Sequence, residues 1–237
     1  MYKISNISKD FIEHSWLSLL KIKKPFKKNA LTKINLDVPR SGIIGLYGPN
    51  GSGKSTILKI ISGLLTQDEG IIDPSFEKLD KSYVSGNDRS FFWRLSVRQN
   101  LLFFGQLHNL KKEELNQKIA KLSKRFDLLN ILDNRFMSLS SGNKRKVSIV
   151  RALLRDSELT LFDEITNSLD NESKAKVLID ISKACKNNNS LIFWATHDVS
   201  ELEQVADKVV VLKNGACEKI IDRNNNGKLD IRCLINS

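Results

Sequence analysis

The sequence predicts an α/β protein with a parallel-sheet core, helices on both faces of the sheet and an inserted helical part. Short apolar runs that read as buried strands alternate with segments of helical spacing. A glycine-rich turn joins one such run, residues 41–47, to the helical segment that follows it. Residues 97–154 contain no convincing strand, so we expect an all-helical subdomain to interrupt the alternation there.

The expected elements follow one another along all 237 residues. Strands are expected at residues 2–7, 31–38, 41–47, 159–162, 191–195, 209–212 and 216–221. Helices are expected at residues 54–65, 113–129 and 143–154. The second of these helices has an apolar face made of Leu115, Ile119, Leu122 and Phe126. Asn214-Gly215 separates the last two strands and predicts a β-hairpin.

Composition limits the class of protein. Hydrophobic residues make up 41% of the chain, and we expect one domain with its core at roughly residues 1–87 and 156–237 and a helical subdomain at roughly 88–155. The three cysteines match no zinc spacing, which favours a reduced cytoplasmic compartment. No signal peptide is expected, and the longest apolar runs are far shorter than the roughly 20 residues of a membrane span. If the protein works at a membrane, we expect another chain to cross it.

The net charge of +11 suggests an anionic neighbour, which is a nucleotide, a nucleic acid or the inner leaflet of a membrane. A solvated basic surface explains the same charge equally well. Residues 14–36 contain no acidic residue, and six lysines fall there: Lys21, Lys23, Lys24, Lys27, Lys28 and Lys33. We expect this segment either to contact an anionic membrane or to form a solvated surface.

The turn after residues 41–47 matches the phosphate-binding pattern G-x-x-x-x-G-K-[ST] in full. Its residues are Gly48, Pro49, Asn50, Gly51, Ser52, Gly53, Lys54, Ser55 and Thr56. Glycines let the backbone wrap so that successive N–H groups point at phosphates, and the following helix adds the positive end of its dipole. Lys54 supplies a cation for the outer phosphates and Ser55 a hydroxyl for Mg²⁺. The pattern predicts an ATP and Mg²⁺ site.

A second motif is a buried strand that ends in two carboxylates, at residues 159–164. Asp163 is expected to hold Mg²⁺ through water, and Glu164 is expected to polarise the water that attacks the terminal phosphate. By itself an acidic loop after a strand is common. Paired with the phosphate-binding loop, it predicts nucleotide hydrolysis.

A third motif resembles the LSGGQ signature of ABC ATPases. Leu139-Ser140-Ser141-Gly142-Asn143 precedes a basic helix, with Ser141 and Asn143 in place of the usual Gly and Gln. The resemblance extends over essentially the whole chain. It implies a P-loop NTPase fold: a parallel-sheet core with an antiparallel β subdomain and an inserted all-helical subdomain. It also implies that Ser140 and Gly142 bind the γ-phosphate of ATP held by a second subunit.

Other positions take roles only through this resemblance. Asn167-Ser168-Leu169-Asp170 resembles the D-loop, which crosses the dimer interface, and His197 resembles the switch histidine that touches the γ-phosphate. Asn87 stands where the family has the Q-loop glutamine, one methylene longer. Two phenylalanines compete for the aromatic position that stacks on adenine, Phe11 and, after the basic insertion, Phe26.

The resemblance implies an ATP-hydrolysing subunit that works as a homodimer with a separate integral membrane permease, peripheral at the cytoplasmic face of the inner or plasma membrane, with no nucleic acid partner. Ser90-Phe91-Phe92-Trp93-Arg94 lies where the family receives the permease, and three adjacent aromatics cannot all face inward. This run and the basic insertion look more like exporters than importers. One alternative is a soluble ABC ATPase acting on nucleic acid or another macromolecular complex. A P-loop kinase or small GTPase leaves Ser140 and His197 unexplained.

Overall fold

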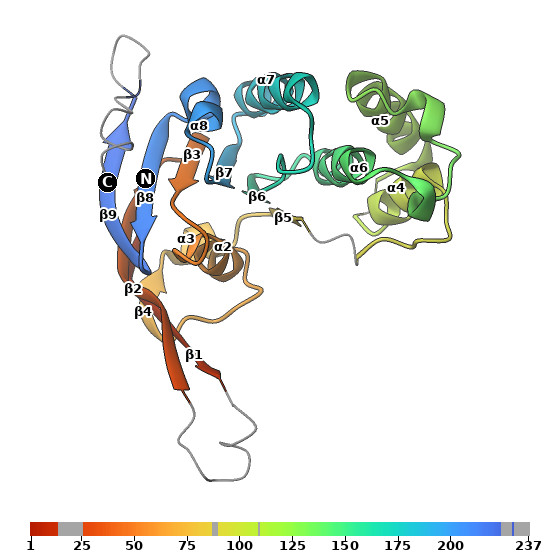
Figure 1. The fold of residues 1–237 in the computed structure, drawn as a ribbon. Helices are drawn as coiled ribbons and strands as arrows, with labels where there is room; N and C mark the ends of the chain where they lie inside the picture. Colours follow the sequence, from red (N-terminus) through yellow and green to blue (C-terminus); the bar gives the residue numbers. More distant parts are fainter. Residues whose placement is uncertain (14–25, 87–89, 109, 224–228, 230–237) are drawn as a thin grey trace, which may run out of the picture. The chain divides into compact units, whose positions relative to one another are not determined.

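A computed structural model describes residues 1–13, 26–86, 90–108, 110–223 and 229. The chain forms two compact units, one of Met1–Leu79 with Phe193–Ser237 and one of Asp80–Ile192. Figure 1 shows the elements of each unit. The boundary falls inside β7 (Leu191–Thr196). The helical subdomain expected at roughly residues 88–155 has other boundaries than the second unit, and it stays a prediction.

The first unit contains a three-stranded antiparallel sheet in the order β2-β1-β4 (Figure 1). Its strands are β1 (Tyr2–Glu13), β2 (Phe26–Val38) and β4 (Glu69–Ile72). Ile7 and Ile34 pair across β1 and β2 and are fully buried. β1 and β2 are longer than the strands expected at residues 2–7 and 31–38. Their outer halves are rich in charged residues and lack the apolar alternation that marks a strand, so the sequence pattern did not predict them.

The other strands of this unit lie in the order β7-β3-β8-β9. β3 (Gly42–Tyr47) runs parallel to β8 (Lys208–Lys213), which pairs antiparallel with β9 (Ala216–Asp222). Asn214 and Gly215 both have positive φ, 49° and 78°, as a two-residue hairpin turn requires. The hairpin prediction is therefore confirmed.

The helices of the first unit are α2 (Lys54–Ile61), α3 (Pro74–Glu77) and α8 (Val199–Val205). α2 ends before residue 65, where the sequence predicted its end. Gly63 turns the chain there with φ 80°, and its N–H donates to the carbonyl of Ile60 at 3.0 Å.

The second unit combines a parallel strand pair with four longer helices. β5 (Lys81–Ser85) pairs with β6 (Leu159–Asp163). The helices are α4 (Val97–Gln106), α5 (Lys112–Arg125), α6 (Ser141–Leu153) and α7 (Asn171–Asn188), with short 3₁₀ turns η2 (Leu129–Ile131) and η3 (Phe136–Ser138). Where residues 97–154 are described they form helices and turns and no strand, as predicted. None of the described helices is both long and apolar enough to cross a membrane.

Candidate functional site

The glycine-rich loop after β3 is shaped by its glycines. A Cβ on Gly48 would lie 2.2 Å from the carbonyl oxygen of Leu212 and 2.6 Å from Oγ of Ser52. Gly53 adopts φ 105°, and a Cβ there would lie 2.9 Å from the carbonyl oxygen of Ala30. Other residues would clash at both positions, so the backbone path of this loop requires glycine.

Helix α2 begins directly after this loop and has no side-chain cap. Its first intrahelical bond runs from the N–H of Ile57 to the carbonyl of Gly53, at 2.9 Å. The N–H groups of its first turn, which holds the exposed Ser55 and the partly exposed Thr56, therefore point out of the helix end. These N–H groups and the helix dipole favour an anion at this place.

Lys54 is almost entirely buried, with 4% of its surface exposed. Its Nζ donates to the carbonyl oxygens of Gly48, at 2.8 Å, and Pro49, at 3.1 Å. The ammonium is thus held inside the curve of the loop. A cation in that place is suited to bind the outer phosphates of a nucleotide, as the sequence pattern predicts.

A groove of about 860 Å³ runs beside the outer halves of β1 and β2. Phe11 lines this groove with 38% of its surface exposed, and Lys9 Nζ lies 6.0 Å from the centroid of its ring. An exposed ring on the wall of a groove is suited to stacking on a flat base. Phe26 begins β2 opposite Glu13. The choice between Phe11 and Phe26 as the adenine contact stays a prediction.

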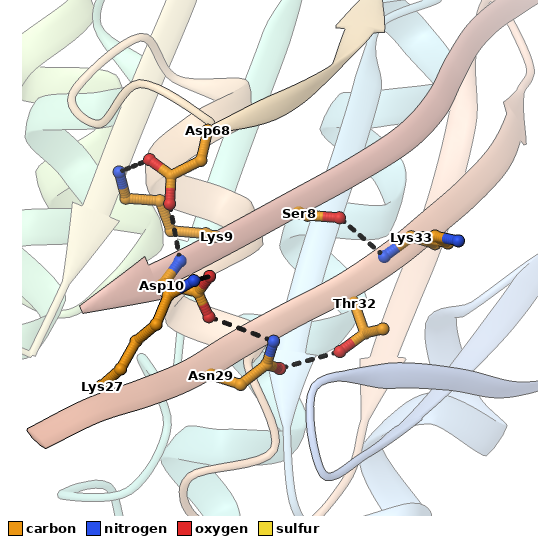
Figure 2. Close-up of polar contacts among 8 residues, drawn as sticks. All are labelled: Ser8, Lys9, Asp10, Lys27, Asn29, Thr32, Lys33 and Asp68. Carbon is orange, nitrogen blue, oxygen red and sulfur yellow. Dashed lines mark hydrogen bonds and ion pairs between the residues drawn. The ribbon is translucent and has the colours of Figure 1, made fainter. Parts of the chain in front are cut away.

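A network of polar contacts fixes the backbone on which Phe11 sits (Figure 2). Asp68 accepts hydrogen bonds from Lys9 Nζ at 2.6 Å and from the backbone N–H of Asp10 at 2.8 Å. Asp10 in turn pairs with Lys27 Nζ at 2.7 Å. The hydrogen bond from Lys9 lowers the pKa of Asp68, and the hydrogen bond to Asp10 raises the pKa of Lys27. Each pair is solvent-exposed and contributes little stability alone, but together they hold β1 in register.

Asp163 ends β6 in the second unit and is buried, with 7% of its surface exposed. The hydroxyl of Tyr83, on the neighbouring strand β5, donates to its Oδ2 at 2.8 Å. Burial raises the pKa of Tyr83, and the charge of Asp163 raises it further, so the phenol keeps its proton. The carboxylate therefore ends the strand as the sequence predicts, with one oxygen already bonded.

Glu164 follows directly and adopts φ 51°, a left-handed backbone that is uncommon for glutamate. Its Oε2 accepts a hydrogen bond from Asn167 Nδ2 at 2.9 Å. The turn takes Glu164 out of the strand path, and the amide of Asn167 restrains the carboxylate. Residues in strained backbone conformations often cluster at active sites, which agrees with the predicted catalytic role.

Ser140 forms the N-cap of α6, where its Oγ accepts the N–H of Asn143 at 3.2 Å. The hydroxyl retains its own proton as a donor. A Cβ on Gly142 would lie 3.2 Å from the carbonyl oxygen of Ser168 and 3.9 Å from the side chain of Leu169, so the structure brings Gly142 close to these two residues. Arg145, on the same helix, is buried and donates to the carbonyl of Ser85 at 2.9 Å.

The remaining predicted residues lie near element ends or outside the described residues. Asp170 is the N-cap of α7 and accepts the N–H of Ser173 at 2.9 Å, a bond that lowers the pKa of Asp170. His197 follows β7 and is exposed. Asn87 lies outside the described residues, so its role stays a prediction.

Two sets of predicted residues are therefore placed, one in each unit. The phosphate-binding loop, Phe11 and His197 belong to the first unit, and the acidic pair belongs to the second together with Ser140, Gly142 and Asp170. That the two sets serve one nucleotide stays a prediction. Sequence reasoning missed Tyr83, and it named Asn167 only as part of the segment that resembles the D-loop; the structure shows that each of the two donates to a carboxylate of the acidic pair.

Residues 31–167 match the sequence profile of the ABC transporter family, which is more than half of the chain. The chain belongs to this family. The predicted ATPase class is thereby confirmed. The chain is 29% identical over 195 residues to the ABC transporter ATP-binding protein NatA of Bacillus subtilis (strain 168), covering 78% of this chain and 79% of NatA.

It is also 31% identical over 213 residues to the sn-glycerol-3-phosphate import ATP-binding protein UgpC of Bartonella bacilliformis (strain ATCC 35685 / KC583 / Herrer 020/F12,63). That match covers 86% of this ABC protein and 62% of UgpC, so the chain spans less than two thirds of the length of this relative. The fold resembles a solved dimeric structure of the ATP-binding cassette MJ0796 in a post-hydrolysis state bound to ADP and Pi. The TM-score is 0.79 at 23% identity, covering 95% of this chain and 100% of that one, which confirms the predicted fold class.

Proposed function

We propose that the chain is the ATP-binding subunit of an ABC transporter, and that it binds and hydrolyses MgATP to drive a separate membrane permease. The observation that carries the proposal is the phosphate-binding loop. It combines glycines required by the backbone, an uncapped helix N-terminus and the buried ammonium of Lys54. These three features suit a polyphosphate.

The donor set also fits a magnesium ion. Mg²⁺ prefers one or two carboxylates together with substrate phosphates and water, and Asp163 supplies a carboxylate at the end of β6. Ser55 and Asp163 would hold the ion, with the carboxylate acting through water. When bound, Mg²⁺ would neutralise charge on the phosphate oxygens.

Glu164 is the proposed general base. Its carboxylate would orient the attacking water and accept the proton, and the hydrogen bond from Asn167 restrains it for that task. His197 is the proposed contact to the γ-phosphate. It is exposed and directly follows the buried strand β7, which ends at Thr196. In both roles the side chain lies at the end of a strand, where parallel sheets place ligand contacts.

The proposed active form is a homodimer in which Ser140 and Gly142 of one subunit contact the ATP of the other. Two features support this. The Ser140 hydroxyl retains a proton to donate, and Gly142 lies in the first turn of α6, where backbone N–H groups have no intrahelical partner. Ser168 and Leu169, which directly precede Asp170, lie close to Gly142 at the same helix start, and Asp170 would belong to the same interface.

The proposed permease contact is an exposed apolar surface made of three aromatic side chains and one methionine: Phe92, Trp93, Phe103 and Met137. The rings of Phe92 and Phe103 meet edge to face with centroids 4.8 Å apart. Buried Asn100 fixes the backbone of this segment, because it accepts a hydrogen bond from the N–H of Phe92 and donates one to its carbonyl. A rigid apolar surface of this kind is typical of a protein interface.

Trp93 also links this surface to the signature helix. Lys144 Nζ, on α6, lies 4.5 Å from the Trp93 ring centroid. A force on this exposed surface would therefore be transmitted through Trp93 and Lys144 to α6, whose N-cap is Ser140. The proposed location is peripheral, at the cytoplasmic face of the membrane that holds the permease. Within the basic segment at residues 14–36, residues 14–25 lie outside the described residues.

The sequence and a named relative favour different directions of transport. The sequence favoured export, whereas UgpC is named as an import ATP-binding protein. Export is therefore not confirmed, and import is the direction that the relatives favour. Uptake against release of substrate in vesicles with the permease distinguishes the two. The alternative of a soluble ABC ATPase acting on nucleic acid gains no support from these relatives, whose names describe transport proteins.

Nucleotide titration of Lys54→Ala tests the proposal. The variant should lose most of its ATP affinity and its turnover, because it removes a desolvated cation from the phosphates. Lys59→Ala is the matched control, since Lys59 is an exposed lysine later on the same helix. Unchanged ATP affinity in Lys54→Ala, or an equal loss in Lys59→Ala, would refute the site assignment.

A further inference from the structure

The contact between Tyr83 and Asp163 joins two neighbouring parallel strands. Tyr83 is paired with Leu161 in the β5–β6 register, and Ser85 is paired with Asp163. Leu161 and Asp163 are two apart on β6 and so share one face of the strand. The long phenol of Tyr83 thus reaches along that face to the carboxylate at the strand end, at 2.8 Å.

The bond matters because Asp163 is a buried acid. A carboxyl group that is nearly removed from solvent needs hydrogen-bond partners for its oxygens. The Tyr83 hydroxyl supplies one donor, to Oδ2. This directed bond restrains the position of Oδ2 and therefore the orientation of the carboxylate.

We propose that Tyr83 is a positioning residue that holds the Asp163 carboxylate in the orientation that binds magnesium. The proposal rests on the proposed function, in which Asp163 binds Mg²⁺ through water. Tyr83 acts only through Asp163 and touches neither metal nor nucleotide. Outer partners of this kind typically change metal affinity 10–100-fold when they are removed.

The competing explanation is ordinary strand packing, in which the phenol fills space between β5 and its surroundings. The two explanations differ in what they affect. Packing would alter the stability of β5 without a specific effect on magnesium. A positioning role would alter magnesium binding while ATP binding without metal stays unchanged.

The test is Tyr83→Phe, which removes only the hydroxyl. Binding of a fluorescent ATP analogue is measured in EDTA and then as Mg²⁺ is raised, so that no turnover is required. We expect the metal-free affinity to match the wild type and the Mg²⁺ concentration at half-effect to rise about 10–100-fold. Tyr2→Phe is the control for loss of a tyrosine hydroxyl elsewhere, since Tyr2 packs its ring on Phe76 in the other unit.

Val84→Ala is the control for packing, because Val84 is a buried neighbour on the same strand. An unshifted Mg²⁺ dependence in Tyr83→Phe, or an equal shift in Val84→Ala, overturns the inference. Adding Tyr83→Phe to Asp163→Asn should produce no further shift, because the partner is already gone; a further shift also overturns it. Wild-type protein that binds no ATP would instead overturn the proposed function.

Discussion

The N-termini of α2 and α6 differ in how the backbone N–H groups of the first helical turn find hydrogen-bond acceptors. The N-cap residue of α2 is Gly53, which has a left-handed conformation and provides no side-chain cap. The N-cap residue of α6 is Ser140, whose hydroxyl caps the helix by accepting the N–H of Asn143. The N–H groups at the start of α2 have no side-chain acceptor and are suited to bind an anion from outside. At the start of α6 the Ser140 hydroxyl already accepts one N–H, so a phosphate there would contact the O–H of Ser140 and the N–H of Gly142.

The difference teaches which parts of the site are backbone and which are side chain. At α2 the sequence is constrained by space, because a Cβ at Gly53 meets the carbonyl of Ala30. At α6 many capping residues would preserve the helix, so the choice of serine carries the information about function. Each variant below should therefore separate stability from activity differently at the two ends.

Gly53→Ala should lower both the stability of the protein and its ATP affinity. The new Cβ clashes with backbone and lies in a positive-φ position, so ATP affinity should fall at least about tenfold, which corresponds to about 1.4 kcal/mol. Gly63→Ala is the control, since Gly63 also has positive φ but open space around it and should cost only about 1–2 kcal/mol of stability. Thermal unfolding and nucleotide titration measure both. Equal ATP affinity in the two variants would contradict the role of Gly53.

Ser140→Asp should separate the two functions of the α6 end. Aspartate caps a helix as well as serine, so stability should stay within about 0.5 kcal/mol. The added charge opposes a phosphate, so ATPase activity should fall about 10²–10³-fold while the ATP affinity of dilute monomer stays unchanged. Ser96→Asp, at the capped start of α4, is the control and should leave activity intact. Loss of monomer affinity in Ser140→Asp would place Ser140 in its own subunit's site.

The features that could be predicted from the sequence are those formed by residues adjacent in the chain. The phosphate-binding loop, the strand ending in Asp163 and the hairpin at Asn214 each lie within a short run of residues, and each has a local physical cause. The contact of Tyr83 with Asp163 joins residues 80 positions apart and left no local signal. The outer halves of β1 and β2 were missed for a related reason, since ion pairs such as Lys27 with Asp10 hold them and not an apolar face.

Asn167→Ala should have a moderate effect on the side-chain part of the site. Without the amide, the Glu164 carboxylate gains freedom, and turnover should fall about tenfold, equivalent to about 1.4 kcal/mol of barrier. ATP affinity should not change, because Asn167 donates to the proposed base and not to the nucleotide. Asn171→Ala, an exposed asparagine at the start of α7, is the control. Steady-state kinetics decide, and a turnover equal to the control would remove Asn167 from the mechanism.

Asp68→Asn should have the smallest effect. The folded-state pKa of Asp68 lies below its ordinary value of 3.8, mainly through the bond from Lys9. Its contribution is therefore present above that ordinary value and is lost as pH falls through the lower folded pKa. Chemical unfolding should show the variant slightly less stable than wild type at pH 7 and equal to it once Asp68 is protonated. A difference that persists unchanged in acid would contradict this.

The most direct test of the central claim is the association of Glu164→Gln with ATP. Glutamine keeps the shape of the side chain and can still accept the Asn167 hydrogen bond, but it cannot take a proton from water. Turnover should fall about 10²–10⁴-fold, which is the usual contribution of a general base. ATP should then accumulate between two subunits, giving a dimer with ATP and a monomer with ADP by size exclusion with light scattering. Wild-type turnover, or a variant that stays monomeric with ATP at every protein concentration, would contradict both the role of Glu164 and the two-subunit site.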